Sequence, residues 1–110
     1  MPANRLLLSV NTTGYVTYLR NAPTYIDARV LAASTNETVT IPADATQVIF
    51  SANADFYVNP NSGTAAVPAG DVTDGTGSEL NPVGYSGLLA GGTFGIISPV
   101  AATITMAFYT

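Results

Sequence analysis

The sequence predicts an all-β protein: a single antiparallel β-sandwich or jelly-roll-like domain of about eight strands, formed by residues 1–110. Segments in which apolar and polar residues alternate recur along the chain, and this pattern is typical of strands with one buried face. Clusters of Gly, Pro, Asn, Asp and Ser separate these segments, as the turns of a sandwich would. No segment has a clear helical pattern, and no linker divides the chain into two domains.

The clearest alternation lies between residues 38 and 58. It predicts strands at 38–41, 46–52 and 55–58, with a tight turn at Pro42-Ala43-Asp44 between the first two. The side chains predicted to face the core are Val39, Ile41, Val48, Phe50, Ala52, Phe56 and Val58.

The segments before this stretch give weaker predictions. Residues 5–10 and 15–19 have strand-like patterns, separated by Gly14, and residues 1–12 form either an arm that reaches a neighbour or an edge strand. Within residues 25–33, Ile26, Val30 and Ala33 have helical spacing, whereas Ile26, Ala28, Val30 and Ala32 have strand spacing. The strands predicted on either side favour a strand. The apolar run at residues 6–10 is shorter than the core of a signal peptide, so we expect neither an export signal nor a membrane anchor.

The second half of the chain predicts two hairpins and a final strand. The first hairpin joins residues 56–58 to 64–67, and the second joins 85–89 to 93–98 through Gly91 and Gly92. Between them, residues 68–84 show no period and predict a long loop. In the last strand, Ile104, Met106 and Phe108 are predicted to face inward, and Thr103, Thr105 and Ala107 outward.

The loop at residues 68–84 is the best candidate for a contact with a partner, because long loops in compact domains usually carry function. It concentrates turn-forming and acidic residues. The predicted contact residues are Asp71, Asp74, Glu79, Leu80 and Asn81.

The chain is unusually poor in charge. Only 9% of its residues are charged, against about 25% in an ordinary domain. With so much apolar surface and so little charge, part of the exterior is expected to lie in contacts between chains, which predicts a homo-oligomer or a docked subunit. The net charge of −4 argues against binding to nucleic acid, which needs clustered cations.

The residue types needed for most catalysis are missing. The sequence contains no histidine, cysteine or lysine, which excludes nucleophilic triads, thiolate chemistry and Schiff bases. We therefore expect no enzyme activity, no catalytic residues and no cofactor.

The Asp74-Gly75-Thr76-Gly77 segment is similar to the Asp-Thr-Gly of aspartic proteases, but the inserted glycine displaces the carboxylate, and Asp74 is interpreted as a turn residue. Three carboxylates at residues 71–79 leave calcium as an alternative, although their spacing fails the EF-hand pattern and we expect no metal.

Residues 48–82, VIFSANADFYVNPNSGTAAVPAGDVTDGTGSELNP, resemble small virion-associated proteins of tailed bacteriophages, and the similarity extends over residues 39–110. The resemblance implies a structural protein that decorates or cements the capsid. Such proteins are often β-rich trimers that dock onto major capsid protein subunits. It further implies a place on the capsid surface of the virion, after synthesis in the cytoplasm of the bacterial host.

A second interpretation belongs to a different class. A tail-fibre-associated or host-recognition module that binds a cell-surface glycan would also be acidic, β-rich and oligomeric. Binding to empty capsids, compared with binding to host cells or glycans, separates the two. An unrelated β-sandwich enzyme or chaperone is a third alternative.

Overall fold

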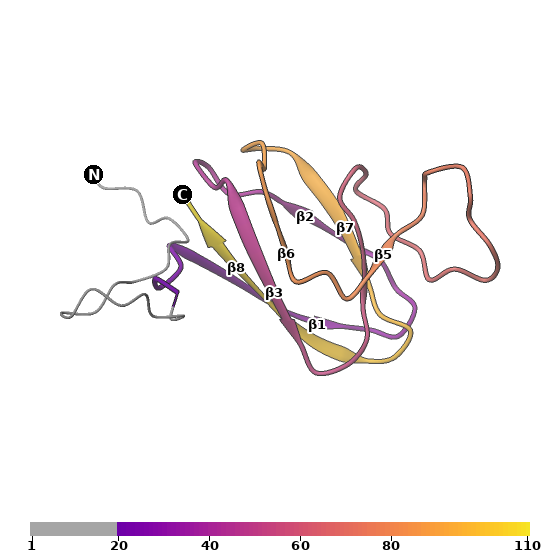
Figure 1. The fold of residues 1–110 in the computed structure, drawn as a ribbon. Helices are drawn as coiled ribbons and strands as arrows, with labels where there is room; N and C mark the ends of the chain where they lie inside the picture. Colours follow the sequence, from indigo (N-terminus) through magenta and orange to yellow (C-terminus); the bar gives the residue numbers. More distant parts are fainter. Residues whose placement is uncertain (1–19) are drawn as a thin grey trace, which may run out of the picture.

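The structure, a computed structural model, describes residues 20–110, and all of their regular elements are β-strands (Figure 1). The strands predicted at 5–10 and 15–19, and the arm or edge strand predicted for residues 1–12, lie outside the described residues. No helix in residues 20–110 is long and apolar enough to cross a membrane. The strands are β1 (Tyr25–Leu31), β2 (Glu37–Thr40), β3 (Gln47–Ala52), β4 (Tyr57–Asn59), β5 (Glu79–Leu80), β6 (Gly84–Ser86), β7 (Thr93–Ile97) and β8 (Ala102–Tyr109).

The strands form two four-stranded antiparallel sheets that pack face to face. Sheet I has the order β1-β8-β3-β6, and sheet II has the order β2-β7-β4-β5. The pairs are nested: β1 lies beside β8, β2 beside β7, β3 beside β6 and β4 beside β5. A long antiparallel hairpin rolled up in this way is the jelly-roll arrangement, so the predicted fold class is confirmed.

The turn predicted at residues 42–44 is present. The Ala45 N–H donates to the carbonyl of Pro42 at 3.2 Å, and Asp44 adopts a left-handed backbone with φ of 65°. The predicted inward-facing residues of β2, β3 and β4 are buried, with one exception. Ala52 is exposed, because β3 ends there at the rim of the sandwich.

In β8, Ile104, Met106 and Phe108 are buried as predicted. Ala107 lies on the outer face, as predicted, but it is only 5% exposed. Its neighbours in the two flanking strands are Ile26 and Ile49, and their larger side chains cover the small one between them.

Both predicted hairpins are wrong. Residues 64–67 form no strand, and β4 pairs with β5 and β7 instead, so the segment predicted as a loop at 68–84 contains β5 and the first residue of β6. Likewise β6 pairs with β3, whereas β7 belongs to the other sheet. A Cβ atom on Gly84 would lie 2.2 Å from the Val48 carbonyl oxygen, so the close approach of β6 to β3 requires glycine at this position.

The core lies between the sheets and is centred on aromatic rings. Phe50 packs against Phe56, Tyr85 and Phe94 with ring centroids 5.7, 5.7 and 5.8 Å apart, and two of these contacts are edge-on. Aliphatic side chains from both sheets fill the remaining space: Leu31, Val39, Ile41, Val48, Val58, Ile96, Ile104 and Met106.

The segment that follows β4 lies over sheet II and leaves no room for a side chain at Gly95. A Cβ atom there would lie 2.4 Å from the Ala65 nitrogen. Asn36 fixes this segment at two points, because its side chain donates to the Gly63 carbonyl at 3.1 Å and accepts the Ala65 N–H at 2.7 Å. This anchoring explains why residues 64–67 cover sheet II rather than extending it as a strand.

Candidate interaction surfaces

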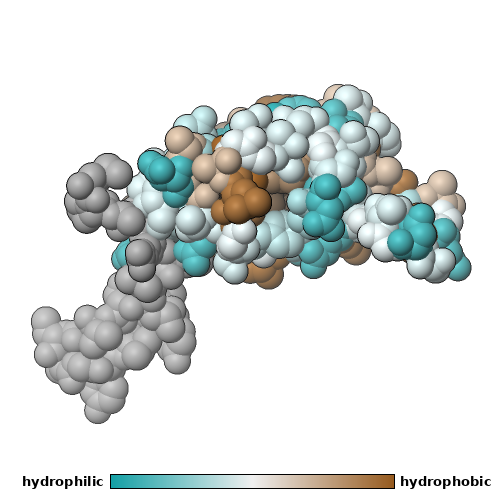
Figure 2. Space-filling view, turned by 90° about the horizontal axis from the view of Figure 1, so that it is seen from above, coloured by the Kyte–Doolittle hydropathy of each residue, from teal (hydrophilic) through white to brown (hydrophobic). Residues whose placement is uncertain are grey.

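The loop between residues 68 and 78 projects from one end of the sandwich, at the right of Figures 1 and 2. Asp71 and Asp74 are both exposed in it. The Asp74 carboxylate accepts the Thr76 hydroxyl at 2.6 Å and the Thr76 N–H at 3.1 Å, and these hydrogen bonds lower the pKa of Asp74. The interpretation of Asp74 as a turn residue is therefore confirmed.

The other three predicted contact residues lie on the body of the sandwich rather than in the projecting loop. Glu79 and Leu80 form β5, where half of the Leu80 side chain is exposed. Glu79 accepts a hydrogen bond of 2.6 Å from the Tyr85 hydroxyl. Partial burial and this anionic neighbour both favour the protonated phenol and raise the pKa of Tyr85.

Asn81 holds two segments of the sandwich together. It adopts a left-handed backbone with φ of 49°, and its side chain accepts the Phe56 N–H at 3.0 Å and donates to Asp55 at 3.0 Å. Its own N–H donates to the Phe56 carbonyl at 2.8 Å. Asn81 thus fastens the end of β5 to the segment that leads into β4.

The three acidic residues of segment 71–79 do not form a group that could hold a metal ion. Across the described part of the chain, no group of three acidic, histidine or cysteine side chains is arranged to hold a metal ion. The calcium alternative therefore has no support in the geometry.

A cavity of about 420 Å³ lies at the base of the projecting loop. Its polar groups are hydroxyls and one amide, and neither aromatic rings nor carboxylates line it. The lining residues are Asn59, Thr64, Ala66, Pro68, Gly70, Val72, Thr76, Gly77 and Ser78.

The outer face of sheet I carries an apolar stripe along β1. Ile26, Ala28 and Val30 point outward, and Ile26 and Val30 are 60% and 78% exposed. The strand spacing noted in the sequence thus marks the solvent side of β1, whereas Asp27 and Arg29 point toward sheet II.

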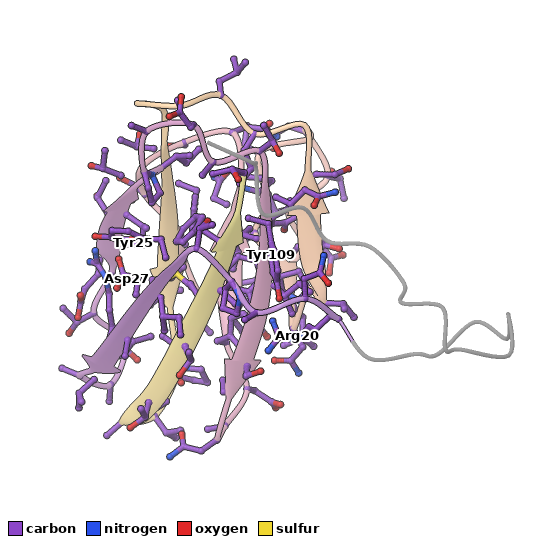
Figure 3. The ribbon with its side chains drawn as sticks, turned by 90° about the vertical axis from the view of Figure 1, so that its left-hand side faces the viewer. Arg20, Tyr25, Asp27 and Tyr109 are labelled. Atoms are coloured by element: carbon purple, nitrogen blue, oxygen red, sulfur yellow. The ribbon has the colours of Figure 1, made fainter. Side chains whose placement is uncertain are left out.

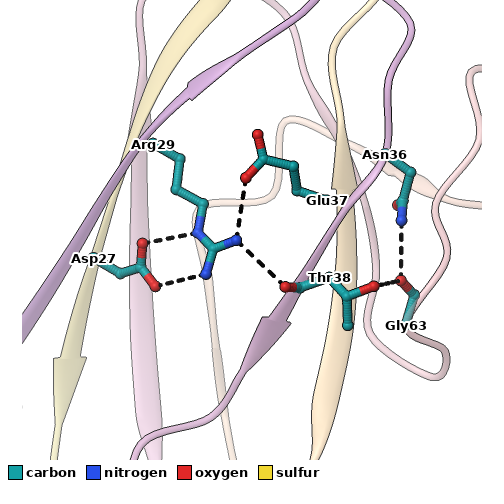
Figure 4. Close-up of polar contacts among 6 residues, drawn as sticks. All are labelled: Asp27, Arg29, Asn36, Glu37, Thr38 and Gly63. Carbon is teal, nitrogen blue, oxygen red and sulfur yellow. Dashed lines mark hydrogen bonds and ion pairs between the residues drawn. The ribbon is translucent and has the colours of Figure 1, made fainter.

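An ion-pair network explains why the charged residues of β1 face inward and its apolar residues face solvent. The network joins the two sheets at one side (Figure 4). Arg29 donates to both carboxylate oxygens of Asp27, at 2.9 and 3.1 Å, and to Glu37 on β2 at 3.2 Å. It also donates to the Thr38 carbonyl at 3.3 Å. The hydrogen bond with Asp27 is the largest effect that raises the pKa of Arg29. Because these inward-facing charges are paired, the apolar residues of β1 are left on the outside.

A second contact that the sequence did not predict lies at the end of β8 (Figure 3). The Tyr109 hydroxyl donates to the Asn21 carbonyl at 2.8 Å and accepts a hydrogen bond from Arg20. The Arg20 guanidinium also lies 5.9 Å from the centre of the Tyr109 ring, within range of a cation–π contact. Tyr109 is fully buried as a result, so the described chain begins fastened against the last strand.

No family model, curated protein or solved structure matches this chain. The fold and the surfaces define a β-sandwich with jelly-roll topology. Its function has to be argued from those surfaces.

Proposed function

We propose that this chain is a non-enzymatic structural protein of a phage particle, which decorates or cements the capsid by docking onto major capsid protein subunits. The observation that carries the proposal is the open apolar stripe of Ile26, Ala28 and Val30 on sheet I. The chain has only three basic and seven acidic residues, so few charged side chains are available to keep other molecules away from such a stripe. Exposed apolar surface of this kind is typical of a contact with another protein.

The topology supports the same conclusion. Jelly rolls are common in viral coat domains, although they also occur in lectins, so the fold alone does not choose a function. The resemblance of residues 48–82 to virion-associated proteins favours the coat protein class. The place of action would be the capsid surface, after synthesis in the cytoplasm of the bacterial host.

The projecting loop supplies a second, polar contact. Asp71 and Asp74 stand clear of the sandwich and present carboxylates to a neighbour. A homo-oligomer, which the resemblance suggests is a trimer, would repeat both contacts around its axis. Linked copies gain effective concentration, so several weak contacts hold tightly together.

Co-sedimentation with purified empty capsids of the phage that encodes the chain tests the proposal. Val30→Asp should weaken binding at least tenfold, because it places a charge in an apolar contact. Leu89→Asp is the matched control, since Leu89 is equally exposed at 78% but lies in the loop after β6. Failure of the wild-type chain to sediment with capsids, or equal binding by the two variants, would overturn the proposal.

The glycan-binding alternative rests on a different observation, the cavity at the base of the projecting loop. Hydroxyls of Thr64, Thr76 and Ser78 and the amide of Asn59 are polar groups of the kind that bind a sugar. Those of Thr76, Ser78 and Asn59 already form hydrogen bonds within the chain, so a sugar would share or replace these bonds. The cavity has no aromatic ring for a sugar to stack on, which places this function second. Binding to a glycan array or to intact host cells, with none to capsids, would favour it instead.

A further inference from the structure

The outer edge of β1 is the longest open sheet edge in the described structure. β1 has seven residues, whereas the other edge strands, β2, β5 and β6, have four, two and three. No strand within residues 20–110 pairs with this side of β1. An open edge presents backbone N–H and C=O groups to another strand, and natural proteins usually keep such edges short or covered.

The neighbouring edge of the sandwich, formed by β2, is partly blocked by a side chain. At β2, the Arg29 guanidinium caps the Thr38 carbonyl from the side. The β1 edge contains no proline, glycine or lysine, which interrupt or repel an added strand, and the charges of its inward-pointing Asp27 and Arg29 are paired with each other. Of the two edges on this side of the molecule, only β1 is therefore suited to accept a partner strand.

We propose that β1 pairs antiparallel with β1 of a second copy, about a twofold axis that passes through Ala28. The two copies of sheet I then form one continuous sheet of eight strands. Ala28 is the middle residue of β1, so all seven residues find an opposite residue in this register. The contact is isologous and closes after two copies.

The side chains of β1 are complementary to themselves in this register. On the inner face, Asp27 lies opposite Arg29 of the second copy, and Arg29 lies opposite Asp27 of that copy. On the outer face, Ile26 lies opposite Val30 of the second copy. Cross-strand pairs of opposite charge and of apolar side chains both stabilise antiparallel sheets.

Other registers lack this complementarity. A shift of the paired positions by two residues places Asp27 opposite Asp27, or Arg29 opposite Arg29, and pairs only five of the seven residues. Like charges directly opposite one another are destabilising. A shift by one places the outer face of one copy on the inner face of the other, which breaks the continuity of the sandwich.

The inference does not depend on the proposed function. It concerns a contact between two copies of this chain and would hold with or without a capsid. A threefold contact, as the resemblance suggests, would have to use a different surface. The apolar stripe on the outer face of sheet I would become twice as wide in the pair.

Cysteine cross-linking of the full chain tests the register directly, because the sequence contains no cysteine. Opposite residues in an antiparallel pair have Cα atoms about 4.5–5.5 Å apart, within the range that a disulfide spans. Ala28→Cys should therefore form a covalent dimer under mild oxidation. Ser51→Cys is the matched control, because Ser51 is also exposed on sheet I but lies on β3, away from the edge. Equal cross-linking of the two variants would overturn the proposal.

Charge at the twofold axis gives an independent test in solution. Ala28→Lys and Ala28→Glu each place like charges opposite one another, and Ala28 is exposed, so folding should be retained, as far-UV circular dichroism would verify. By light scattering after size exclusion, each variant alone should lose the dimer at twice the 11.3 kDa chain mass, with the dissociation constant raised several-fold. An equimolar mixture of the two should restore it. An assembly whose size does not respond to either change would overturn the proposal.

Discussion

Phe50 lies at the centre of the aromatic cluster between the two sheets. Its ring contacts those of Phe56, Tyr85 and Phe94 and is only 7% exposed. Phe50→Ala removes this buried ring and leaves a cavity among the remaining aromatic side chains. Such a truncation costs about 3–5 kcal/mol of unfolding free energy. That loss is a large share of the roughly 5–15 kcal/mol that stabilises a typical domain.

Urea unfolding followed by far-UV circular dichroism measures this loss. The midpoint for Phe50→Ala should fall markedly while the slope stays unchanged, which marks a change in stability alone. Leu89→Ala serves as the control, because Leu89 is 78% exposed, lies outside β1, and its truncation should change the free energy by no more than about 0.5 kcal/mol. A cost below about 1 kcal/mol for Phe50→Ala would refute the assignment of this ring to the centre of the core. Phe50→Asp, which buries an unpaired charge, should not fold.

Three further changes test local features. Gly95→Ala should cost about 1–3 kcal/mol, because its Cβ would lie 2.4 Å from the Ala65 nitrogen; a thermal midpoint equal to that of the wild type would contradict the packing of this loop. Thr76→Val removes the hydroxyl that bonds Asp74, so the pKa of Asp74 should rise toward its ordinary value in an NMR titration. Because the pKa of Asp74 is lowered in the folded chain, ionised Asp74 favours the turn at a pH above the ordinary carboxyl pKa, and this contribution is lost as the pH falls through the lowered pKa of Asp74. An unchanged pKa of Asp74 in Thr76→Val would rule out the hydroxyl as the cause. Asn81→Ala leaves the Phe56 N–H without its acceptor, so stability should fall by about 1–3 kcal/mol and that amide should exchange faster with solvent; unchanged exchange would show that the bond is dispensable.

The sequence predicted the strands whose alternation matches a buried face. In β2, β3 and β8, apolar residues at every second position occupy the core, because these strands each have one face against the opposite sheet. The fold class follows from the same regularity, repeated between clusters of turn residues. Burial of alternate side chains is a local property of a strand, so a local pattern is enough to reveal it.

Strand pairing could not be predicted in the same way. The sequence suggested that neighbouring segments pair, but a jelly roll pairs β3 with β6 and β2 with β7, across long stretches of chain. The two-residue strand β5 has too few positions to show a period, and its place is fixed by the hydrogen bonds of Asn81 to Phe56. These contacts join distant residues and leave no periodic mark.

The surfaces were predicted only in part. The loop with Asp71 and Asp74 projects from the sandwich, as a candidate contact loop should, whereas Asn81 is bound into the body. The open stripe on β1 was not identified, because its alternation is that of a buried face. The pairing of Arg29 with Asp27 and Glu37, together with the register of β1 against β8, reveals that the charged side of this strand faces inward.

The proposed role on a capsid can be checked by cryo-electron microscopy of particles of the phage inferred to encode the chain. If the proposal is right, density for the sandwich lies on the outer surface of the head, with the outer face of sheet I turned toward the shell. Density for this chain confined to the tail, or a head-bound sandwich whose Ile26 and Val30 face the solvent, would contradict it.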